Sequence, residues 1–358
     1  MEGFGNYSYE LVKRMVNNHP EQLFVLFFDR PVDPKFVFPE NVQTVVLFPP
    51  TRHPLLWILW FEWRLKKALK KYNIDLLWTP DGFCSLGSSV PQIATIHDLN
   101  FEHYPKDLPW LVSRYFRTFF PKFARKARHI LTVSEFSKKD ILDKYGVSST
   151  KISVVYNGIN DAFGVLTEDE RFATRQKYAN GKPFFLFVGS LHPRKNVKRL
   201  VEAFTEFSIN HSEIDLVIVG NAMWKQEAFN LSEETKKRIH FLGHLSTSEL
   251  SRITGAAFAL SYVPYFEGFG IPLVEAMRCG VPIISAQTSC LPEIAGDAAI
   301  YCDPFSVKDI VQKMDKLAND PELQVSLTQH GLTRSTQFSW DLAAEQVWEV
   351  LVKHSPVV

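Results

Sequence analysis

Short apolar runs alternate with amphipathic stretches along the whole chain. The runs have the length of buried strands, and the stretches between them repeat their apolar positions with the period of a helix. Strands and helices in alternation are typical of parallel sheets joined by crossover helices. The pattern therefore predicts the α/β fold class.

The two halves of the chain repeat this pattern. In the first half, strands are predicted at residues 23–28, 44–47, 75–78, 92–96, 130–133 and 152–156, and helices at 7–17, 54–71, 110–128 and 137–145. In the second half, strands are predicted at 184–188, 215–219, 239–242, 257–261, 282–285 and 299–301, and helices at 197–209, 271–279, 307–318, 321–330 and 340–353. No strand precedes the first helix, although such a sheet normally begins with one, which favours a late start site or a truncated chain.

Length and composition narrow the class of protein. A chain of 358 residues is long enough for two domains, and we interpret the polar stretch 161–182 as the linker between them. Lys and Arg number 40 against 39 Asp and Glu, so the overall charge does not indicate a nucleic-acid partner. The four cysteines lack metal-ligand spacing and suit reduced thiols in a cytoplasmic protein. The longest strongly apolar run, 55–63, is shorter than the roughly 20 residues of a membrane-spanning helix.

Two cations follow the first predicted strand of the second half. The strand ends at Gly189, and the loop after it carries Arg194 and Lys195. Ligands of open α/β sheets bind beyond the carboxyl ends of strands, and a guanidinium with an ammonium suits a diphosphate. The alternative is an exposed basic loop before a helix.

A second motif runs from Glu267 to Glu275. Gly270 permits a tight turn, and Pro272 suits the first turn of a helix, whose free amides form an anion site. Helical side chains lean toward the N-terminus, so Glu275 can point into the same space as Glu267. The alternative for Glu275 is local capping or pairing.

These residues occur in an order that resembles the family-4 retaining glycosyltransferases. The shared elements are Gly189 with Arg194-Lys195-Asn196, Glu267-Gly268-Phe269-Gly270 with a second glutamate at 275, and Gly280-Val281-Pro282. The resemblance implies the GT-B fold, in which two Rossmann-like parallel-sheet domains face each other across a cleft. It implies an N-terminal acceptor-side domain of residues 1–160, joined by a C-terminal helix within 338–358 that crosses back to it, and a donor-binding domain of 161–337.

The resemblance also implies roles for individual residues. It assigns catalytic positions to four residues, namely His97, Arg194, Lys195 and Glu267. The two cations are expected to hold the donor diphosphate, Glu267 the hydroxyls of the transferred sugar, and His97 the region of the reacting carbon. Donor-binding positions are implied for Gly3 and Gly5 in an N-terminal glycine loop, and for Gly189, Phe269, Gly270, Ile271 and Glu275.

The implied activity is transfer of a hexosyl group, first of all mannosyl, with retention of configuration. The donor is expected to be GDP-mannose or a UDP-sugar, without a metal or other cofactor, and the acceptor a saccharide or lipid-linked saccharide of envelope polysaccharide synthesis. Two alternatives remain: a nucleotide-sugar epimerase of the same fold, and a non-catalytic nucleotide-sugar-binding remnant. A nicotinamide dehydrogenase is disfavoured, because neither half has a Gly-x-Gly-x-x-Gly turn after its first strand.

The predicted helix 54–71 suggests contact with a membrane. Its buried stripe is expected to hold Ile58, Phe61, Leu65 and Leu69, and its other face Trp60, Trp63, Arg64, Lys67 and Lys71. Aromatic and basic residues on one outer face suit an anionic headgroup layer, which places the protein at the inner face of the plasma membrane. The alternative is a solvated face with the tryptophans packed on loops. A second basic stretch, in 110–128, is interleaved with phenylalanines.

Overall fold

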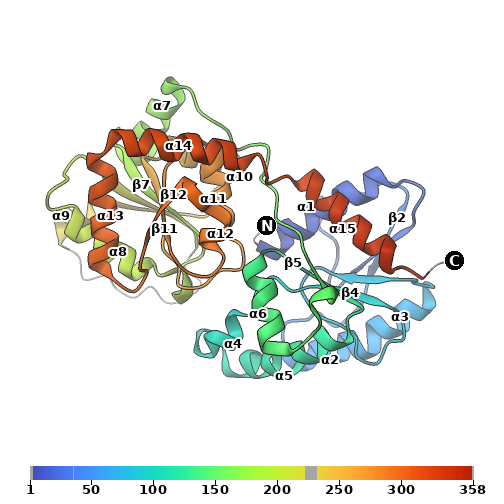
Figure 1. The fold of residues 1–358 in the computed structure, drawn as a ribbon. Coiled ribbons are helices and arrows are strands. Elements are labelled where there is room, and N and C mark those ends of the chain that lie inside the picture. Colours follow the sequence, from blue (N-terminus) through green and yellow to red (C-terminus); the bar gives the residue numbers. More distant parts are fainter. Residues whose placement is uncertain (1–2, 35, 222–231, 357–358) are drawn as a thin grey trace. The chain divides into compact units, whose positions relative to one another are not determined.

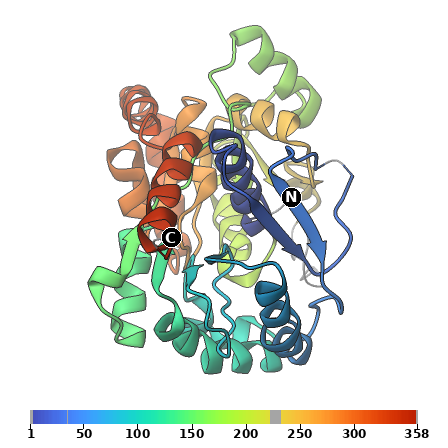
Figure 2. The same ribbon diagram turned by 90° about the vertical axis from the view of Figure 1, so that its right-hand side faces the viewer.

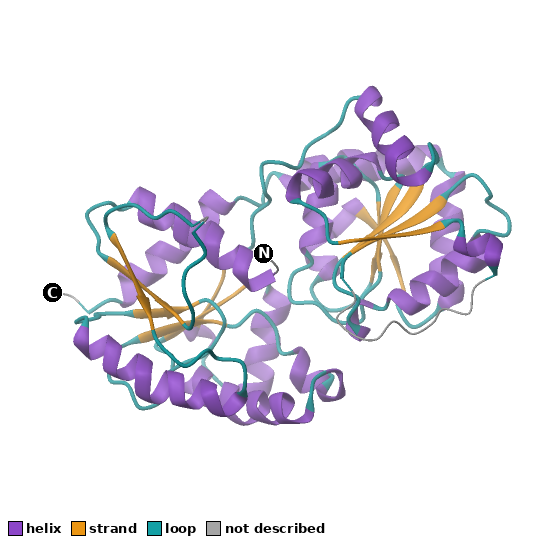
Figure 3. Ribbon diagram, turned by 180° about the vertical axis from the view of Figure 1, so that it is seen from behind, coloured by secondary structure: helices purple, strands orange, loops and turns teal. Residues whose placement is uncertain are grey.

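The computed structural model describes residues 3–34, 36–221 and 232–356. The chain forms two compact units. Unit 1 comprises Met1–Gly158 and Ser339–Val358, and unit 2 comprises Ile159–Phe338. In each unit the strands are parallel and enclosed by helices, as Figure 3 shows.

Unit 1 contains two parallel sheets (Figure 1). The first pairs β1 (Phe24–Phe28) with β2 (Val42–Val46), and the second has the order β3-β4-β5-β6, with β3 Leu77–Thr79, β4 Gln92–Thr95, β5 His129–Thr132 and β6 Ile152–Val154. Its helices are α1 (Gly3–Asn18), α2 (Pro54–Leu59), η1 (Trp60–Leu65), α3 (Lys66–Lys71), α4 (Asn100–His103), η2 (Pro105–Asp107), α5 (Trp110–Lys126), α6 (Glu135–Tyr145), η3 (Ser149–Lys151) and α15 (Trp340–His354). Strands β4 and β5 are buried along their whole length, as a parallel sheet covered on both faces requires.

The C-terminal helix α15 belongs to unit 1, where it packs beside α1 (Figure 2). The rings of Tyr7 and Trp340 lie 6.1 Å apart between these helices. The chain leaves unit 1 after Gly158 and returns at Ser339, and the two passages touch: a Cβ atom on Gly158 would lie 2.1 Å from the Trp340 nitrogen. Only glycine allows this approach.

Unit 2 contains one parallel sheet with the order β12-β11-β10-β7-β8-β9. The strands are β7 (Phe184–Val188), β8 (Asp215–Val219), β9 (Ile239–Gly243), β10 (Ala259–Tyr262), β11 (Ile283–Ala286) and β12 (Ala299–Cys302). The helices are α7 (Glu168–Ala179), η4 (Pro193–Lys195), α8 (Val197–Phe207), α9 (Glu233–Lys236), α10 (Thr247–Ala256), α11 (Ile271–Arg278), α12 (Leu291–Ala295), η5 (Gly296–Ala298), α13 (Val307–Asn319) and α14 (Pro321–Ser335). Helices α8 and α13 pack together, as do α7 with α10 and α11 with α14.

The strand order places a switch point between β7 and β10. From β7 the chain moves to β8 and β9 in one direction, whereas β10, β11 and β12 extend the sheet in the other. Connections leave toward opposite faces at such a point, which opens a crevice at the carboxyl ends of the two strands. The loops after β7 and β10 are therefore the expected binding loops of unit 2.

The structure confirms the alternation of strands and helices and corrects three details. The first-half strands form two sheets instead of one. The stretch predicted as a linker contains α7, because Thr167 and Glu170 form a capping box and three acidic residues suit the positive end of the helix. The predicted helix 54–71 contains a π-helical turn, η1, which rotates the faces relative to a regular helix.

One residue of this segment was assigned to the wrong face. Trp60 was expected on the outer face, but it is buried and its Nε1 donates to the Leu47 carbonyl at 2.7 Å. Phe61, Leu65 and Leu69 are buried as predicted. Trp63 is 62% exposed, so only one of the two tryptophans faces outward.

Candidate active site

The loop after β7 is held in place by its neighbours. The Gly189 amide donates to the Val219 carbonyl at 2.9 Å, and a Cβ atom on Gly220 would lie 1.9 Å from the Gly189 oxygen. The loop then forms the short helix η4, where His192 Nδ1 accepts from the Arg194 amide at 3.3 Å. This turn directs Arg194 and Lys195 toward the loop after β10.

Asn196 ties the two loops together. Its backbone adopts a φ of 60°, which asparagine tolerates better than most residues. Its buried Nδ2 donates to the carbonyls of Val263 at 2.9 Å and Pro304 at 2.7 Å. The position of the two cations is therefore set by long-range hydrogen bonds as well as by local structure.

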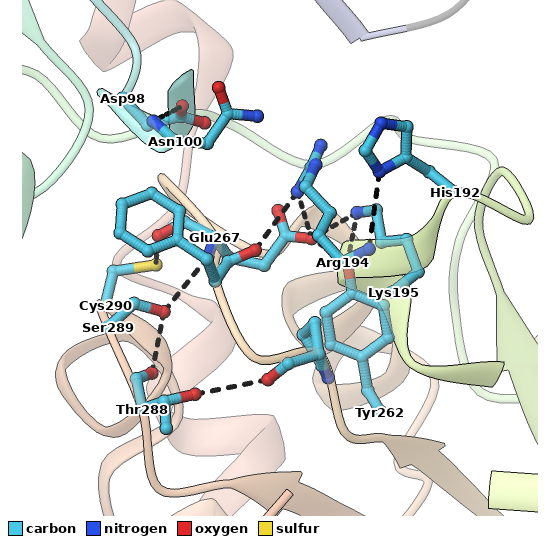
Figure 4. Close-up of polar contacts among 12 residues, drawn as sticks. Asp98, Asn100, His192, Arg194, Lys195, Tyr262, Glu267, Thr288, Ser289 and Cys290 are labelled. Carbon is cyan, nitrogen blue, oxygen red and sulfur yellow. Dashed lines mark hydrogen bonds and ion pairs between the residues drawn. The ribbon is translucent and has the colours of Figure 1, made fainter. Parts of the chain in front are cut away.

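Arg194, Lys195 and Tyr262 converge on one oxygen of Glu267 (Figure 4). Arg194 Nη1 lies 2.8 Å from Glu267 Oε1, and the Tyr262 hydroxyl donates to the same oxygen at 2.9 Å. Lys195 Nζ donates to Glu267 Oε1 and also to the Tyr262 hydroxyl oxygen, the latter at 2.6 Å. Among the described residues, none donates a hydrogen bond to Oε2 of Glu267, so this oxygen keeps its capacity to accept.

The loop after β11 holds the backbone of Glu267. The Glu267 amide donates to Ser289 Oγ at 3.1 Å, and the Cys290 thiol donates to the Glu267 carbonyl at 3.3 Å. Ser289 has a φ of 53°, an uncommon conformation for serine, and its hydroxyl donates to the Thr288 carbonyl at 2.8 Å. Both the carboxylate and the peptide of Glu267 are thus fixed before any ligand binds.

The charges of the cluster determine its protonation. Burial works to raise the pKa of Glu267, but the positive charges of Arg194 and Lys195 outweigh it and hold that pKa below its usual value. Burial, with the Glu267 carboxylate beside it, raises the pKa of Tyr262 well above its usual value. At neutral pH the cluster therefore contains an ionised glutamate, a neutral tyrosine and two cations, with a net positive charge.

Helix α11 begins next to this cluster in the sequence. Gly270 precedes it with a φ of 88°, and a Cβ atom there would lie 2.9 Å from a Leu291 methyl group. The first turn of α11 has fewer free amides than the sequence predicted. Pro272 has no N–H, and the Leu273 amide donates to the Gly270 carbonyl at 2.9 Å. The Ile271 amide is the donor left in this turn, among the residues that the structure describes.

Glu275 lies on the second turn of α11 and takes no part in the cluster. In the described part of the chain, its carboxylate has neither a hydrogen bond nor an ion pair. Burial alone raises its pKa to about 8, so the group is largely protonated at neutral pH. A protonated carboxyl group both donates and accepts hydrogen bonds, which suits vicinal hydroxyl groups.

His97 follows β4 in unit 1. Its Nε2 lies 2.8 Å from the Pro80 carbonyl, which can only accept, so Nε2 carries the hydrogen and Nδ1 does not. Burial lowers the pKa of His97, so the ring is neutral at neutral pH. The Tyr7 ring packs edge-on against the imidazole at 4.6 Å, which brings helix α1 to the carboxyl end of β4.

The predicted N-terminal glycine loop is wrong. Gly3 and Gly5 lie in the first turn of α1. The helix extends this far because Tyr7, Leu11 and Met15 form a buried stripe, and tertiary packing of such a stripe outweighs the low helix propensity of glycine. Gly3, Gly5 and His97 belong to unit 1, and their part in donor binding stays a prediction.

Sequence reasoning missed Tyr262 and Ser289. The strand 257–261 was predicted to stop one residue before Tyr262, although a tyrosine at the carboxyl end of a buried strand is a candidate for a binding crevice. No local signal marked Ser289, because its role depends on contact with a loop 22 residues earlier. Across the described residues, no group of three or more His, Cys, Asp or Glu side chains is placed to hold a metal ion.

Comparison with known families covers both units. Residues 1–163 match the family described as Glycosyltransferase Family 4, and residues 169–334 match Glycosyl transferases group 1. The chain belongs to the glycosyltransferases.

Individual relatives agree with this assignment. The glycosyltransferase is 28% identical to O-antigen chain mannosyltransferase B of Escherichia coli over 97% of its own length and 94% of the relative. Its fold is similar to the crystal structure of WaaG, a glycosyltransferase involved in lipopolysaccharide biosynthesis, with a TM-score of 0.78, 16% identity and coverage of 98% and 96% of the two chains. It is also similar to Anabaena HepE in complex with UDP-glucose, with a TM-score of 0.75, 17% identity and coverage of 96% and 95%. Both structures are GT-B glycosyltransferases, which confirms the predicted fold class.

Proposed function

We propose that this glycosyltransferase moves a hexosyl group, first of all mannosyl, from a nucleotide-diphosphate sugar to a saccharide or lipid-linked saccharide acceptor during envelope polysaccharide synthesis. The observation that carries the proposal is the cluster of Arg194, Lys195 and Glu267 at the switch point of unit 2. The mannosyl group and the polysaccharide are supported by the Escherichia coli relative, an O-antigen chain mannosyltransferase. A UDP-sugar donor remains the second candidate, because the similar HepE structure contains UDP-glucose.

Each member of the cluster has a role that follows from its contacts. Arg194 and Lys195 supply charge-assisted donors for the donor diphosphate, and the amide of Ile271 adds a backbone donor. The Oε2 atom of Glu267 accepts from hydroxyls of the transferred sugar, because Oε1 is already occupied by three donors. Glu275 binds the hydroxyls of the nucleotide ribose.

The reaction develops positive charge at the anomeric carbon and negative charge on the leaving diphosphate. The two cations stabilise the leaving group without a metal ion. Glu267 is a weak nucleophile, since its charge is shared by Arg194, Lys195 and the Tyr262 hydroxyl. We therefore propose attack by the acceptor on the face from which the diphosphate departs, with the donor phosphate taking the acceptor proton and the configuration retained.

Unit 1 carries a surface that suits a membrane. Leu55 is 67% exposed and Trp63 is 62% exposed, and Arg64 and Lys67 are exposed on the same α2–η1–α3 segment. Apolar and basic groups together favour peripheral binding to anionic headgroups, at the inner face of the plasma membrane. Among the described helices, none has both the length and the apolar character needed to cross a bilayer.

Transfer assays with the full chain test the activity. GDP-mannose and a panel of UDP-sugars are offered with mannose oligosaccharides, in the presence and absence of a chelator, and the anomeric configuration of the product is determined by NMR. We expect a retained product, no effect of the chelator, and loss of transfer in Lys195→Ala and Glu267→Ala. An inverted product would exclude the proposed mechanism, and an epimerised free sugar would favour the epimerase.

A separate assay tests the membrane surface. Sedimentation with vesicles of anionic or zwitterionic lipid should show binding to the anionic vesicles alone, reduced by Trp63→Ala and by added salt. The absence of binding at low salt would exclude the membrane contact and leave the transfer reaction unaffected.

A further inference from the structure

Unit 1 contains a groove that the donor site does not use. It lies between α4, η2 and the first turns of α5, and its volume is about 610 Å³. The lining includes Lys106, Trp110, Arg114 and Arg117. We refer to it as the α5 groove.

The α5 groove has an excess of positive charge. Its lining contains three cations, Lys106, Arg114 and Arg117, and one carboxylate, Glu102. The carboxylate is already engaged, because its Oε1 accepts from the Tyr145 hydroxyl at 3.1 Å and its Oε2 accepts from Arg117 Nε at 3.3 Å. This contact orients Arg117, and its two terminal nitrogens form no hydrogen bond with the described residues.

The other two cations have no partner of opposite charge among the described residues. In the described part of the chain, neither the Arg114 guanidinium nor the Lys106 ammonium forms a hydrogen bond or an ion pair. Both residues are exposed, and Asp107, next to Lys106 in the chain, is not among the lining residues. Three cations against one carboxylate, around one concave space, suit a multivalent anion such as a phosphate or diphosphate.

Trp110 adds a surface for a sugar ring. Its side chain is 73% exposed at the start of α5, and the Arg114 guanidinium carbon lies 5.7 Å from its ring centre. An exposed tryptophan offers a large flat apolar face at small entropic cost. The groove therefore combines a stacking face with an anion site.

The place of the groove in the sheet agrees with a ligand site. Helix α4, η2 and the start of α5 all follow the carboxyl end of β4, the strand after which His97 lies. Ligands of open α/β sheets bind beyond the carboxyl ends of the strands. The corresponding edge of unit 2 carries the cluster that is proposed to bind the donor.

We propose that the α5 groove binds a phosphate or diphosphate group of the saccharide acceptor, with Trp110 stacked on the adjoining sugar ring. The proposal rests on the proposed transfer reaction and specifies its acceptor as an anionic, phosphate-linked saccharide. Arg114 and Arg117 hold the anion, and Lys106 adds a third positive charge.

The experiment compares two acceptors that differ in one group. A mannose oligosaccharide is linked to an octyl chain either through a phosphodiester or through a neutral glycoside, and transfer to each is measured with the full chain. We expect the phosphodiester to have a KM at least tenfold lower. The double variant Arg114→Ala/Arg117→Ala should remove this preference by raising the KM for the phosphodiester acceptor alone. Equal KM values in the wild type would overturn the proposal.

A control variant separates the groove from charge in general. Lys139→Ala/Lys144→Ala removes two exposed cations from the neighbouring helix α6, and it should keep the preference for the phosphodiester. If it abolishes the preference as the groove variant does, the groove is not the anion site. Trp110→Ala should raise the KM for both acceptors, because the sugar ring is common to them.

Donor hydrolysis in the absence of acceptor distinguishes a failure of the proposed transfer reaction from a failure of the proposed acceptor groove. The groove variant should hydrolyse the sugar nucleotide at the rate of the wild type, since the donor cluster is unchanged. Wild-type protein that neither hydrolyses the donor nor transfers to either acceptor contradicts the proposed reaction. Active wild-type protein that does not distinguish the acceptors contradicts the groove alone.

Discussion

The Tyr262 hydroxyl lies between Lys195 and Glu267, accepting from the ammonium at 2.6 Å and donating to the carboxylate at 2.9 Å. Tyr262 ends β10 and Lys195 ends η4, which follows β7, so the contact links the two strands at the switch point of unit 2. The tyrosine is a positioning residue, since it fixes the two charged groups that are proposed to bind the donor.

Replacement of Tyr262 by phenylalanine should reduce kcat/KM for the donor about tenfold. The variant keeps the ring but loses two hydrogen bonds to charged groups, and a loss of about 1.4 kcal/mol corresponds to this factor. The measurement is transfer kinetics at varied donor concentration. Tyr301→Phe serves as the matched control, because the Tyr301 hydroxyl donates to the Gly296 carbonyl at 2.6 Å in the same unit. Equal kinetic effects in the two variants would contradict a positioning role.

Replacement of Glu267 by glutamine should separate transfer from binding of the nucleoside diphosphate. Transfer should fall at least about 100-fold, because the sugar loses a charged acceptor in the transition state. The product nucleoside diphosphate should bind more tightly, because Arg194 and Lys195 lose their shared counter-charge. Isothermal titration calorimetry with GDP and UDP measures this second effect. Weaker binding of both nucleotides would contradict the account of the ion pairs.

Glu275 should make the stability of the protein depend on pH. Its pKa rises from 4.5 to about 8 in the folded chain, so the folded state binds more protons than the unfolded state between these values. The contribution of Glu275 to the free energy of unfolding should therefore be most favourable below about pH 4.5. It should fall as the pH rises toward about 8.

The measurement is chemical unfolding across that pH window, with Glu275→Gln as the reference. The variant has no titrating group at this position, so the difference in unfolding free energy between wild type and variant isolates Glu275. A difference that does not change with pH would show that the carboxyl group is not desolvated in the folded chain.

Gly158→Ala should loosen the C-terminal helix from unit 1. A Cβ atom at this position would lie 2.1 Å from the Trp340 nitrogen, so the backbone that leads into α15 must move. We expect a lower midpoint of thermal unfolding and faster proteolysis within residues 339–356. Gly164→Ala is the control, because a Cβ atom there meets no atom within 4 Å, and it should leave both properties unchanged. Similar losses in the two variants would contradict the proposed close approach.

Much of the fold could be predicted from the sequence, because buried parallel strands are continuous apolar runs and their helices are amphipathic. Strand β7, with five apolar residues in succession, and β8 were predicted with their observed bounds. The errors fall where local pattern is weak. The short π-helical turn at Trp60 leaves the apolar spacing almost unchanged, and the capped polar helix α7 has a composition that is also typical of a linker.

The sequence by itself determined the fold class and the residues that carry the charge of the proposed donor site. Arg194, Lys195 and Glu267 were evident because cations after a strand and a glutamate in a glycine-rich turn are local patterns. Only the tertiary structure decided which atoms meet. Because β7 and β10 are neighbours, all three donors meet at Glu267 Oε1, and Tyr262 lies between Lys195 and Glu267. The burial of Glu275 away from this cluster, which raises its pKa, is also a result of tertiary packing. Strands β7 and β10 are separated by 70 residues in the chain, and their pairing follows from the packing of the whole sheet, which no local pattern contains.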